Sequence, residues 1–202
     1  MAITNGYATL AQLRSGLTIP TADTTDDTKL ELIVQAVSRK IDQYCRRRFW
    51  VNSADETRYY NAVTNRVAII DDCSTCTSVA LDNTGNRASY TTLTLSTDYD
   101  LLPDNAALDS IPWNAIQLAP YSTYRFNMYP KTIKVVGKFG WSAIPDVVRE
   151  ACLLWSARIY ARKDVRFGEA GSPSVGVIAF IPEMDADVKA LLAPPMRRLQ
   201  GV

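Results

Sequence analysis

The sequence has 202 residues, of which 47% are hydrophobic and 21% are charged, and its formal net charge is +1. This composition is typical of a globular chain with one sizeable core and room for a small second domain, and it excludes a disordered or collagen-like protein. Histidine is absent, which excludes Ser-His-Asp or Cys-His catalysis and His-ligated zinc, so the composition favours a non-enzymatic function.

Charge is distributed unevenly along the chain. Residues 50–130 contain nine acidic and four basic residues, a net charge of −5, and the two flanks together carry +6. Such segregation suits a protein that places one surface against an oppositely charged neighbour or along DNA, and chance with solubility is the alternative. No apolar run approaches the roughly 18–20 residues of a membrane helix, and Met1–Gly6 lacks the pattern of a signal peptide. We therefore expect a cytosolic protein without membrane contact.

Two helices are predicted in the first 49 residues. A short one spans Thr9–Ser15, with Thr9 as its N-cap and Gly16 as its stop. A longer one begins at Asp26 or Asp27 and ends at Arg46–Arg48, where basic residues suit the helix dipole. Its apolar stripe predicts core packing and comprises Leu30, Ile33, Val34, Val37, Ile41, Tyr44 and Cys45.

Residues 50–139 predict an antiparallel β-rich region. Short β-prone runs alternate with turn signals, and no helical pattern lies between them. The runs are Thr57–Tyr60, Arg66–Ile70, Thr77–Leu81, Tyr90–Leu95 and Thr132–Phe139. Cys73 and Cys76 fall between the second and third run, in a pattern typical of strand, turn, strand. We interpret them as turn thiols, with a metal site or a redox pair as alternatives.

Carboxylates of this region offer oxygen ligands for a divalent cation at Asp71-Asp72 and Asp98-Tyr99-Asp100. Adjacent strand residues point to opposite faces, so Asp71 and Asp72 could face one ion only across a turn. We interpret all four as solvated loop acids. No phosphate loop or acid–base pair is visible. We predict no catalytic, metal-binding or cofactor-binding residue, no cofactor, and no enzymatic activity.

Helical structure returns after residue 139. Pro145 suits the first position of a helix, whose apolar face comprises Val148, Ala151, Cys152, Trp155 and Ile159. The stretch Asp164–Pro182 is rich in small residues, shows no helix or strand pattern and becomes apolar at Val177–Ile181. Stretches of this length are usually functional or ordered by a partner. A last helix is expected at Asp185–Leu192, followed by a basic tail.

In chain order, these elements predict an α+β fold class: a helical bundle of about four helices with an inserted antiparallel β-rich region. The order of the predicted elements also sets the predicted domain boundaries. Residues 1–49 and 140–202 form the helical core, and residues 50–139 form the inserted domain.

Two basic clusters lie at the C-terminal ends of predicted helices, with net charges of +4 over residues 39–48 and +3 over residues 158–166. Solvated helix ends matched to the dipole would explain both clusters. Non-specific contact with DNA phosphates is the alternative. The residues proposed to face DNA are Arg46, Arg47, Arg48, Arg162 and Lys163.

The order of segments resembles the head–tail connector family of tailed bacteriophages, also called adaptor or head-completion proteins, over nearly the whole chain. The resemblance rests on Ile41–Phe49 (IDQYCRRRF), on Gly137–Pro145 (GKFGWSAIP), which opens the long helix, and on Asp185–Val188 with Leu191–Pro194. The β-rich insert is larger than in the smallest family members.

The resemblance implies a structural virion protein of the neck, assembled in the host cytoplasm. Family members form a ring, expected here to be a dodecamer, that lies beneath the portal protein, extends the channel for double-stranded DNA and docks tail-side neck or tail terminator proteins. Such a ring uses a heterologous interface. Residues implied for portal docking are Leu191, Leu192, Arg197, Arg198 and Leu199. An inter-subunit loop is expected to include Phe167, Val175, Val177, Ile178 and Phe180.

Three other functions are compatible with the sequence. The chain could be a tail terminator or tail-completion protein at a different place in the same particle. It could be a non-specific DNA-binding protein of the packaging machinery. An enzyme that uses Cys73 and Cys76 is the third. The order of helices and inserted strands favours the connector.

Overall fold

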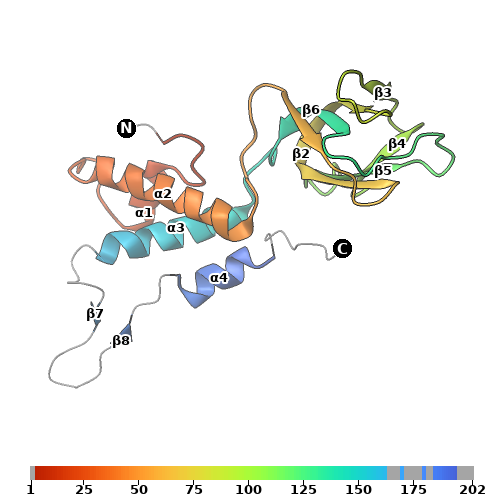
Figure 1. The fold of residues 1–202 in the computed structure, drawn as a ribbon. Coiled ribbons are helices and arrows are strands. Elements are labelled where there is room, and N and C mark those ends of the chain that lie inside the picture. The colour runs from red at the N-terminus through yellow and green to blue at the C-terminus, as the bar shows by residue number, and fades with distance from the viewer. Residues whose placement is uncertain (1–2, 163–168, 171–178, 181–183, 195–202) are drawn as a thin grey trace. The chain divides into compact units, whose positions relative to one another are not determined.

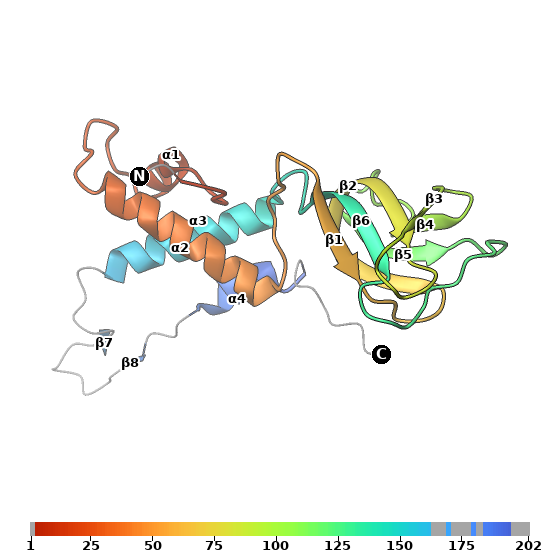
Figure 2. The same ribbon diagram turned by 45° about the horizontal axis from the view of Figure 1, so that its top comes forward.

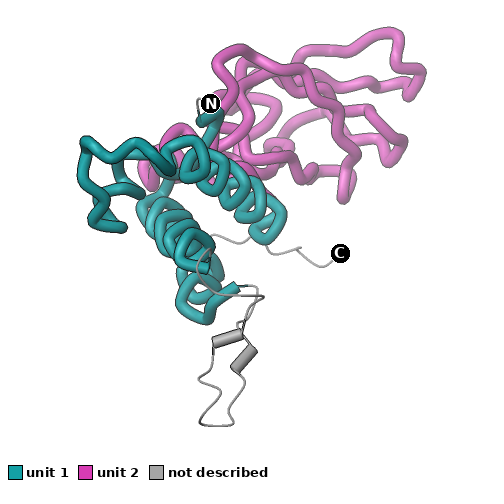
Figure 3. The backbone as a smooth tube through the Cα atoms, turned by 90° about the vertical axis from the view of Figure 1, so that its left-hand side faces the viewer, with its two compact units in different colours: residues 1–46, 144–198 teal, residues 47–143, 199–202 magenta. Residues whose placement is uncertain are grey.

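The structure, a computed structural model, describes residues 3–162, 169–170, 179–180 and 184–194 (Figures 1 and 2). The chain divides into two compact units (Figure 3). The helical unit contains residues 1–46 and 144–198, and the sheet unit contains residues 47–143 and 199–202. Two segments far apart in the sequence therefore build the helical unit.

The described helices are α1 (Leu10–Gly16), α2 (Asp27–Cys45), α3 (Asp146–Ala161) and α4 (Ala186–Leu192). The predicted cap at Thr9 is confirmed, because its hydroxyl accepts a hydrogen bond from the Gln12 amide at 3.2 Å. The Gln12 side chain in turn accepts one from the Thr9 amide at 2.9 Å. This capping box satisfies donors that the first helical turn leaves without partners.

Helices α2 and α3 pack antiparallel. Tyr160, near the end of α3, donates a hydrogen bond to Asp26, just before α2, at 2.5 Å. Ser38 lies buried on α2, where it accepts from the Tyr7 amide at 3.0 Å and donates to the Val34 carbonyl at 2.7 Å. The interior hydroxyl is thus paired. Five positions of the predicted α2 stripe are confirmed as buried: Leu30, Val34, Val37, Ile41 and Cys45.

The sheet unit is built on one six-stranded antiparallel sheet with the order β1-β6-β2-β5-β4, in which β3 also pairs with β2. Its strands are β1 (Glu56–Tyr60), β2 (Val67–Leu81), β3 (Thr91–Leu93), β4 (Tyr99–Leu102), β5 (Trp113–Leu118) and β6 (Ile133–Phe139). Strand β2 holds the sheet together because β3, β5 and β6 all pair with it. Alternation along β6 buries Ile133, Val135 and Phe139.

The predicted fold class, a helical bundle with an inserted β-rich region, is wrong. The six-stranded sheet has a hydrophobic core of its own, to which strands β2 to β6 all contribute buried side chains. A β-rich region with its own core does not depend on a bundle for burial, so it is a unit in its own right. Only the coarser α+β description, with helices and antiparallel strands in separate parts of the chain, agrees with the structure.

The predicted turn between residues 70 and 77 is also wrong, because β2 runs without a break over 15 residues. Asp71 accepts hydrogen bonds from Arg58 at 2.8 Å and from the Tyr60 hydroxyl at 3.1 Å. Asp72 is 4% exposed and pairs with Arg47. Neither is a loop acid, and Asp72 is not solvated, although the Asp71 side chain is 49% exposed. Paired carboxylates can lie within a strand, and irregular register against β6 absorbs the extra residues.

Gly140 directly follows β6, at the point where the chain leaves the sheet. Its φ is +117°, and a Cβ atom there would lie 1.8 Å from the carbonyl oxygen of Trp50. Its amide donates to the Asp72 carbonyl at 2.7 Å. Glycine is required at this position because any side chain would both strain the backbone and collide with the neighbouring strand connection.

Candidate functional site

The three consecutive arginines that follow α2 have different environments. Arg46 is the left-handed C-cap of α2, with φ 54°, and its side chain is exposed. Arg47 forms an ion pair with Asp72 inside the sheet unit. The guanidinium of Arg48 lies 4.5 Å from the centroid of the Trp50 ring. A run that the sequence treats as one basic cluster therefore has separate roles.

Arg47 is a structural residue of the sheet unit. Its Nε and one terminal nitrogen donate to the two carboxylate oxygens of Asp72, both at 2.7 Å. Its side chain is 13% exposed. The guanidinium also lies 5.0 Å from the Trp141 ring centroid, and the Trp141 indole nitrogen donates to Asp72 at 3.2 Å. Because Asp72 offsets the charge of Arg47 and accepts two of its hydrogen bonds, we expect Arg47 to bind a DNA phosphate only weakly.

The structure does not bring together Arg46 and Arg162, the described ends of the two predicted basic clusters. Arg46 follows the end of α2, and Arg162 follows the end of α3, which runs in the opposite direction. Helix α2 has 19 residues, so about 28 Å separates its two ends. Lys163 lies outside the described residues. A shared DNA path along Arg46 and Arg162 would have to follow the length of the helical unit.

Helix α4 carries the described part of the predicted portal-docking set. Leu192 is fully buried within the helical unit, whereas Leu191 is half-buried. Arg158 of α3 fixes the start of α4 by ion pairs to Asp185 and Asp187, each at 2.6 Å. Hydrogen bonds from Arg158 lower the pKa of Asp187. Arg197, Arg198 and Leu199 lie outside the described residues. Of this set, Leu191 alone is described with part of its surface exposed.

Most of the predicted inter-subunit loop lies outside the described residues, namely Phe167, Val175, Val177 and Ile178. Phe180 belongs to β8 (Ala179–Phe180), which pairs antiparallel with β7 (Glu169–Ala170). The sequence shows no strand pattern in this stretch, and the structure nevertheless has these two short strands there. A two-residue strand is too short for its alternation to be visible in a sequence.

Cys73 and Cys76 lie on β2 as free thiols. Cys73 is fully buried and donates to the Thr75 carbonyl at 3.3 Å, while Cys76 is partly exposed. A hydrogen bond with Cys76, together with burial, raises the pKa of Cys73. A thiol held protonated in this way is a poor nucleophile, which argues against a catalytic role for Cys73.

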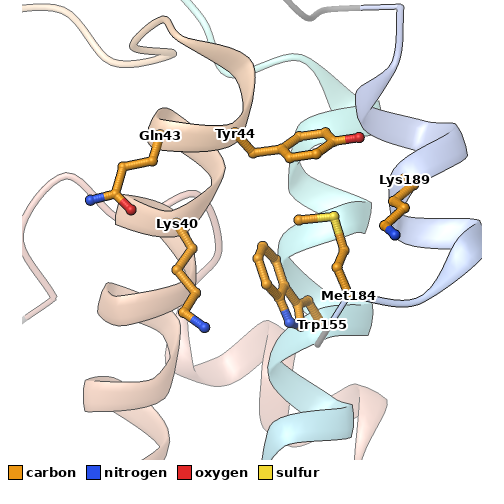
Figure 4. Close-up of a pocket in the computed structure, with 6 residues that line it drawn as sticks. All are labelled: Lys40, Gln43, Tyr44, Trp155, Met184 and Lys189. Carbon is orange, nitrogen blue, oxygen red and sulfur yellow. The ribbon is translucent and has the colours of Figure 1, made fainter. Parts of the chain in front are cut away.

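A pocket of about 470 Å³ lies within the helical unit (Figure 4). It is lined by Lys40, Gln43 and Tyr44 of α2, Trp155 of α3, Met184, and Lys189 of α4. Its buried part is apolar, because Trp155 and Met184 are 2% and 8% exposed, and both lysines are exposed. Sequence reasoning missed this pocket, since its residues come from three helices and Trp155 reads as an ordinary core position.

Two further features bear on what the chain can do. In the described part of the chain, no three His, Cys, Asp or Glu side chains gather as metal ligands would. Among the same residues, no helix is both long and apolar enough to cross a membrane.

No family model matches the sequence, and no curated protein matches it. Among solved structures, a chain of "Neck of empty GTA particle computed with C6 symmetry" matches with a TM-score of 0.57 and 20% identity, covering 100% of this chain and 96% of that one. The chain shares its fold with gene transfer agent proteins. A chain of "Virion of native gene transfer agent (GTA) particle" matches with the same TM-score and coverage at 19% identity. The likeness spans the helical unit and the sheet unit alike.

Proposed function

We propose that this protein is a structural subunit of the neck of a phage-like particle, where copies form a ring between portal and tail. The observation that carries the proposal is the match over the full chain to a protein from the neck of a gene transfer agent particle. A likeness that includes both units supports a common mode of assembly more strongly than a likeness of one helix pair would. The resemblance to head–tail connectors, noted from the sequence, supports the same role.

The chemistry of the described residues supports a role without catalysis. The two carboxylates placed side by side on β2 are paired with arginines, and Cys73 is buried. Neither the paired carboxylates nor Cys73 is thus an activated group, and Cys76, whose pKa the hydrogen bond with Cys73 lowers, is the one reactive thiol of the pair. In this proposal the neck protein works by binding its neighbours, and its assembly takes place in the host cytoplasm.

The ring has three kinds of partner in this proposal: further copies of the chain, the portal and tail-side proteins, and the double-stranded DNA that passes through. Helix α4 and the residues after it face the portal. The helical part of the chain carries the ring, and exposed arginines such as Arg46 line the DNA path. The related neck was computed with C6 symmetry, with which a ring of twelve subunits is compatible.

Electron microscopy of the purified protein mixed with its portal tests this function. The expected result is a second ring stacked coaxially on the portal ring. Particles that lack the chain are expected to lose their DNA and fail to join tails. A ring that binds the tail tube and ignores the portal would identify a tail terminator instead. Tight binding to DNA as a monomer, at physiological salt, would favour a packaging protein.

A deletion tests the proposed inter-subunit loop separately. A chain without Gly168–Phe180 is expected to keep its helical circular dichroism and to lose ring formation. Native mass spectrometry that still shows rings for this variant would remove the loop from the interface and leave the neck function in place.

A further inference from the structure

The pocket between α2, α3 and α4 has the chemistry of a site for an apolar side chain next to a carboxylate. Its floor is the Trp155 ring and Met184, and Lys40 and Lys189 lie at its sides (Figure 4). The Lys40 ammonium lies 5.5 Å from the Trp155 ring centroid. Apolar floors with a few convergent polar groups are typical of binding sites.

The two acids at the start of α4 form their ion pairs with a residue other than Lys189. Asp185 and Asp187 are both held by Arg158 on the neighbouring helix. The indole nitrogen of Trp155 is buried and has no hydrogen-bond partner among the described residues. An acceptor that entered the pocket would therefore meet two cations and an unsatisfied donor nearby.

A turn in the sheet unit has the complementary chemistry. Between β4 and β5 the chain forms turns in which Leu108 and Asp109 both donate backbone hydrogen bonds to the Asn105 carbonyl at 3.0 Å. Leu108 is 84% exposed. Asp109 and Asp104 are also exposed, and neither forms an ion pair with a described residue. The turn thus presents a leucine flanked by carboxylates.

The other exposed apolar residues considered are not followed by a carboxylate that lacks an ion pair. Tyr121 is 99% exposed and has no acidic neighbour in the sequence, and Met128 and Tyr129 precede Lys131. Val147 follows Asp146, but Arg149 already pairs with that carboxylate. Among the described residues with large exposed apolar side chains, Leu108 alone is followed directly by an acidic residue without an ion pair.

We propose that the Leu108–Asp109 turn of one copy docks into the α2–α3–α4 pocket of a second copy. Leu108 packs on Trp155 and Met184, and the Asp109 carboxylate lies between the two lysines. Different surfaces of the two copies meet in this contact, so it is heterologous and can repeat around a closed ring. The inference rests on the proposed neck function and names one contact of its ring. In this contact an acidic turn from residues 50–130 meets lysines from the basic flanks of the chain, which agrees with the uneven charge distribution.

Charge exchange between the two surfaces tests the contact. Full-length wild type, Asp109→Lys, Lys189→Glu and the double variant are compared by sedimentation velocity over a concentration series. Each single variant is expected to need on the order of tenfold more protein to assemble, because an attraction becomes a repulsion. The double variant restores the attraction and is expected to return to within about threefold of wild type. Lys131→Glu is the matched control, since it makes the same charge change on another exposed lysine and should assemble as wild type does.

A site-specific cross-link locates the contact. A photoreactive benzophenone side chain replaces Leu108, and irradiated oligomers are digested and mapped by mass spectrometry. The expected product joins position 108 to the peptides of α3 or α4 in another copy. Rings that form equally well in all variants, or cross-links elsewhere, would overturn the docking contact and leave the neck function standing. A wild-type chain that stays monomeric, with or without portal, would overturn both. Asp109→Lys that assembles as well as or better than wild type would also overturn the contact, because the Asp109 carboxylate would then contribute no attraction.

Discussion

Replacing Arg47 by Met should destabilise the sheet unit far more than the loss of a surface charge would. The change leaves the Asp72 carboxylate, 4% exposed, with the Trp141 indole as its remaining side-chain donor among the bonds described above. Removing one partner of a buried ion pair costs about 3–5 kcal/mol, because the other charge stays desolvated. The unfolding equilibrium constant of the sheet unit would rise by about two to four orders of magnitude.

Urea unfolding measures this effect, followed by tryptophan fluorescence. Three of the four tryptophans, Trp50, Trp113 and Trp141, lie in the sheet unit, so fluorescence reports mainly on it. The control is Arg149→Met on α3 of the helical unit, whose unfolding is followed by far-UV circular dichroism; it removes a pair whose carboxylate side chain is 92% exposed and should cost about 0.2–1 kcal/mol. Equal losses for the two variants would refute the assignment of Arg47 as a structural residue.

A charge-conserving variant separates this role from DNA binding. Lysine at position 47 keeps the charge that a phosphate contact needs but loses the bidentate geometry and the stacking on Trp141. The structural role predicts a loss of about 1.5–3 kcal/mol for Arg47→Lys. The DNA role instead predicts unchanged stability and near-normal binding to DNA.

Three other expectations follow from single positions. Gly140→Ala should cost more than about 3 kcal/mol because of the positive φ and the clash with Trp50, whereas Gly16→Ala, with no atom within 4 Å of the added Cβ, should be neutral or slightly stabilising in thermal unfolding. Thr9→Ala should lower the melting temperature through the loss of the capping box, at about 0.5–2 kcal/mol; an unchanged melting temperature would argue against the cap. Alkylation should reach Cys76 well before Cys73, since the hydrogen bond with Cys73 lowers the Cys76 pKa and the same bond raises the Cys73 pKa. The Cys76 rate should therefore increase at lower pH than that of an ordinary thiol, and peptide mass spectrometry that finds Cys73 modified first would contradict this.

Periodic burial explains which elements were predicted. The α2 stripe repeats at helical spacing, and five of its positions are buried. Strand β6 was predicted because β-branched residues and alternation coincide over Ile133–Phe139. Strands β4 and β5 were missed, because Asp98-Tyr99-Asp100 resembled a loop and Trp113–Leu118 contains polar residues in place of a clean alternation.

Pairing between distant residues explains what could not be predicted. The sequence places Asp71 and Asp72 together as two acids, and nothing local shows that Arg58 and Arg47 take one each. For the same reason Arg46, Arg47 and Arg48 look equivalent, although Arg47 alone is bound by a buried carboxylate. The pocket lined by Lys40, Trp155 and Lys189 likewise exists because three helices meet.

By itself, the sequence determined the helices, most strands of the sheet, the absence of histidine chemistry and the resemblance to phage connectors, because these depend on composition and on periods of a few residues. The tertiary structure alone decided that the β-rich region has its own core, that β2 continues past its two acids, and which charges remain exposed. Those outcomes depend on desolvation and on partners distant along the chain, and a carboxylate's environment cannot be known until its partner is in place.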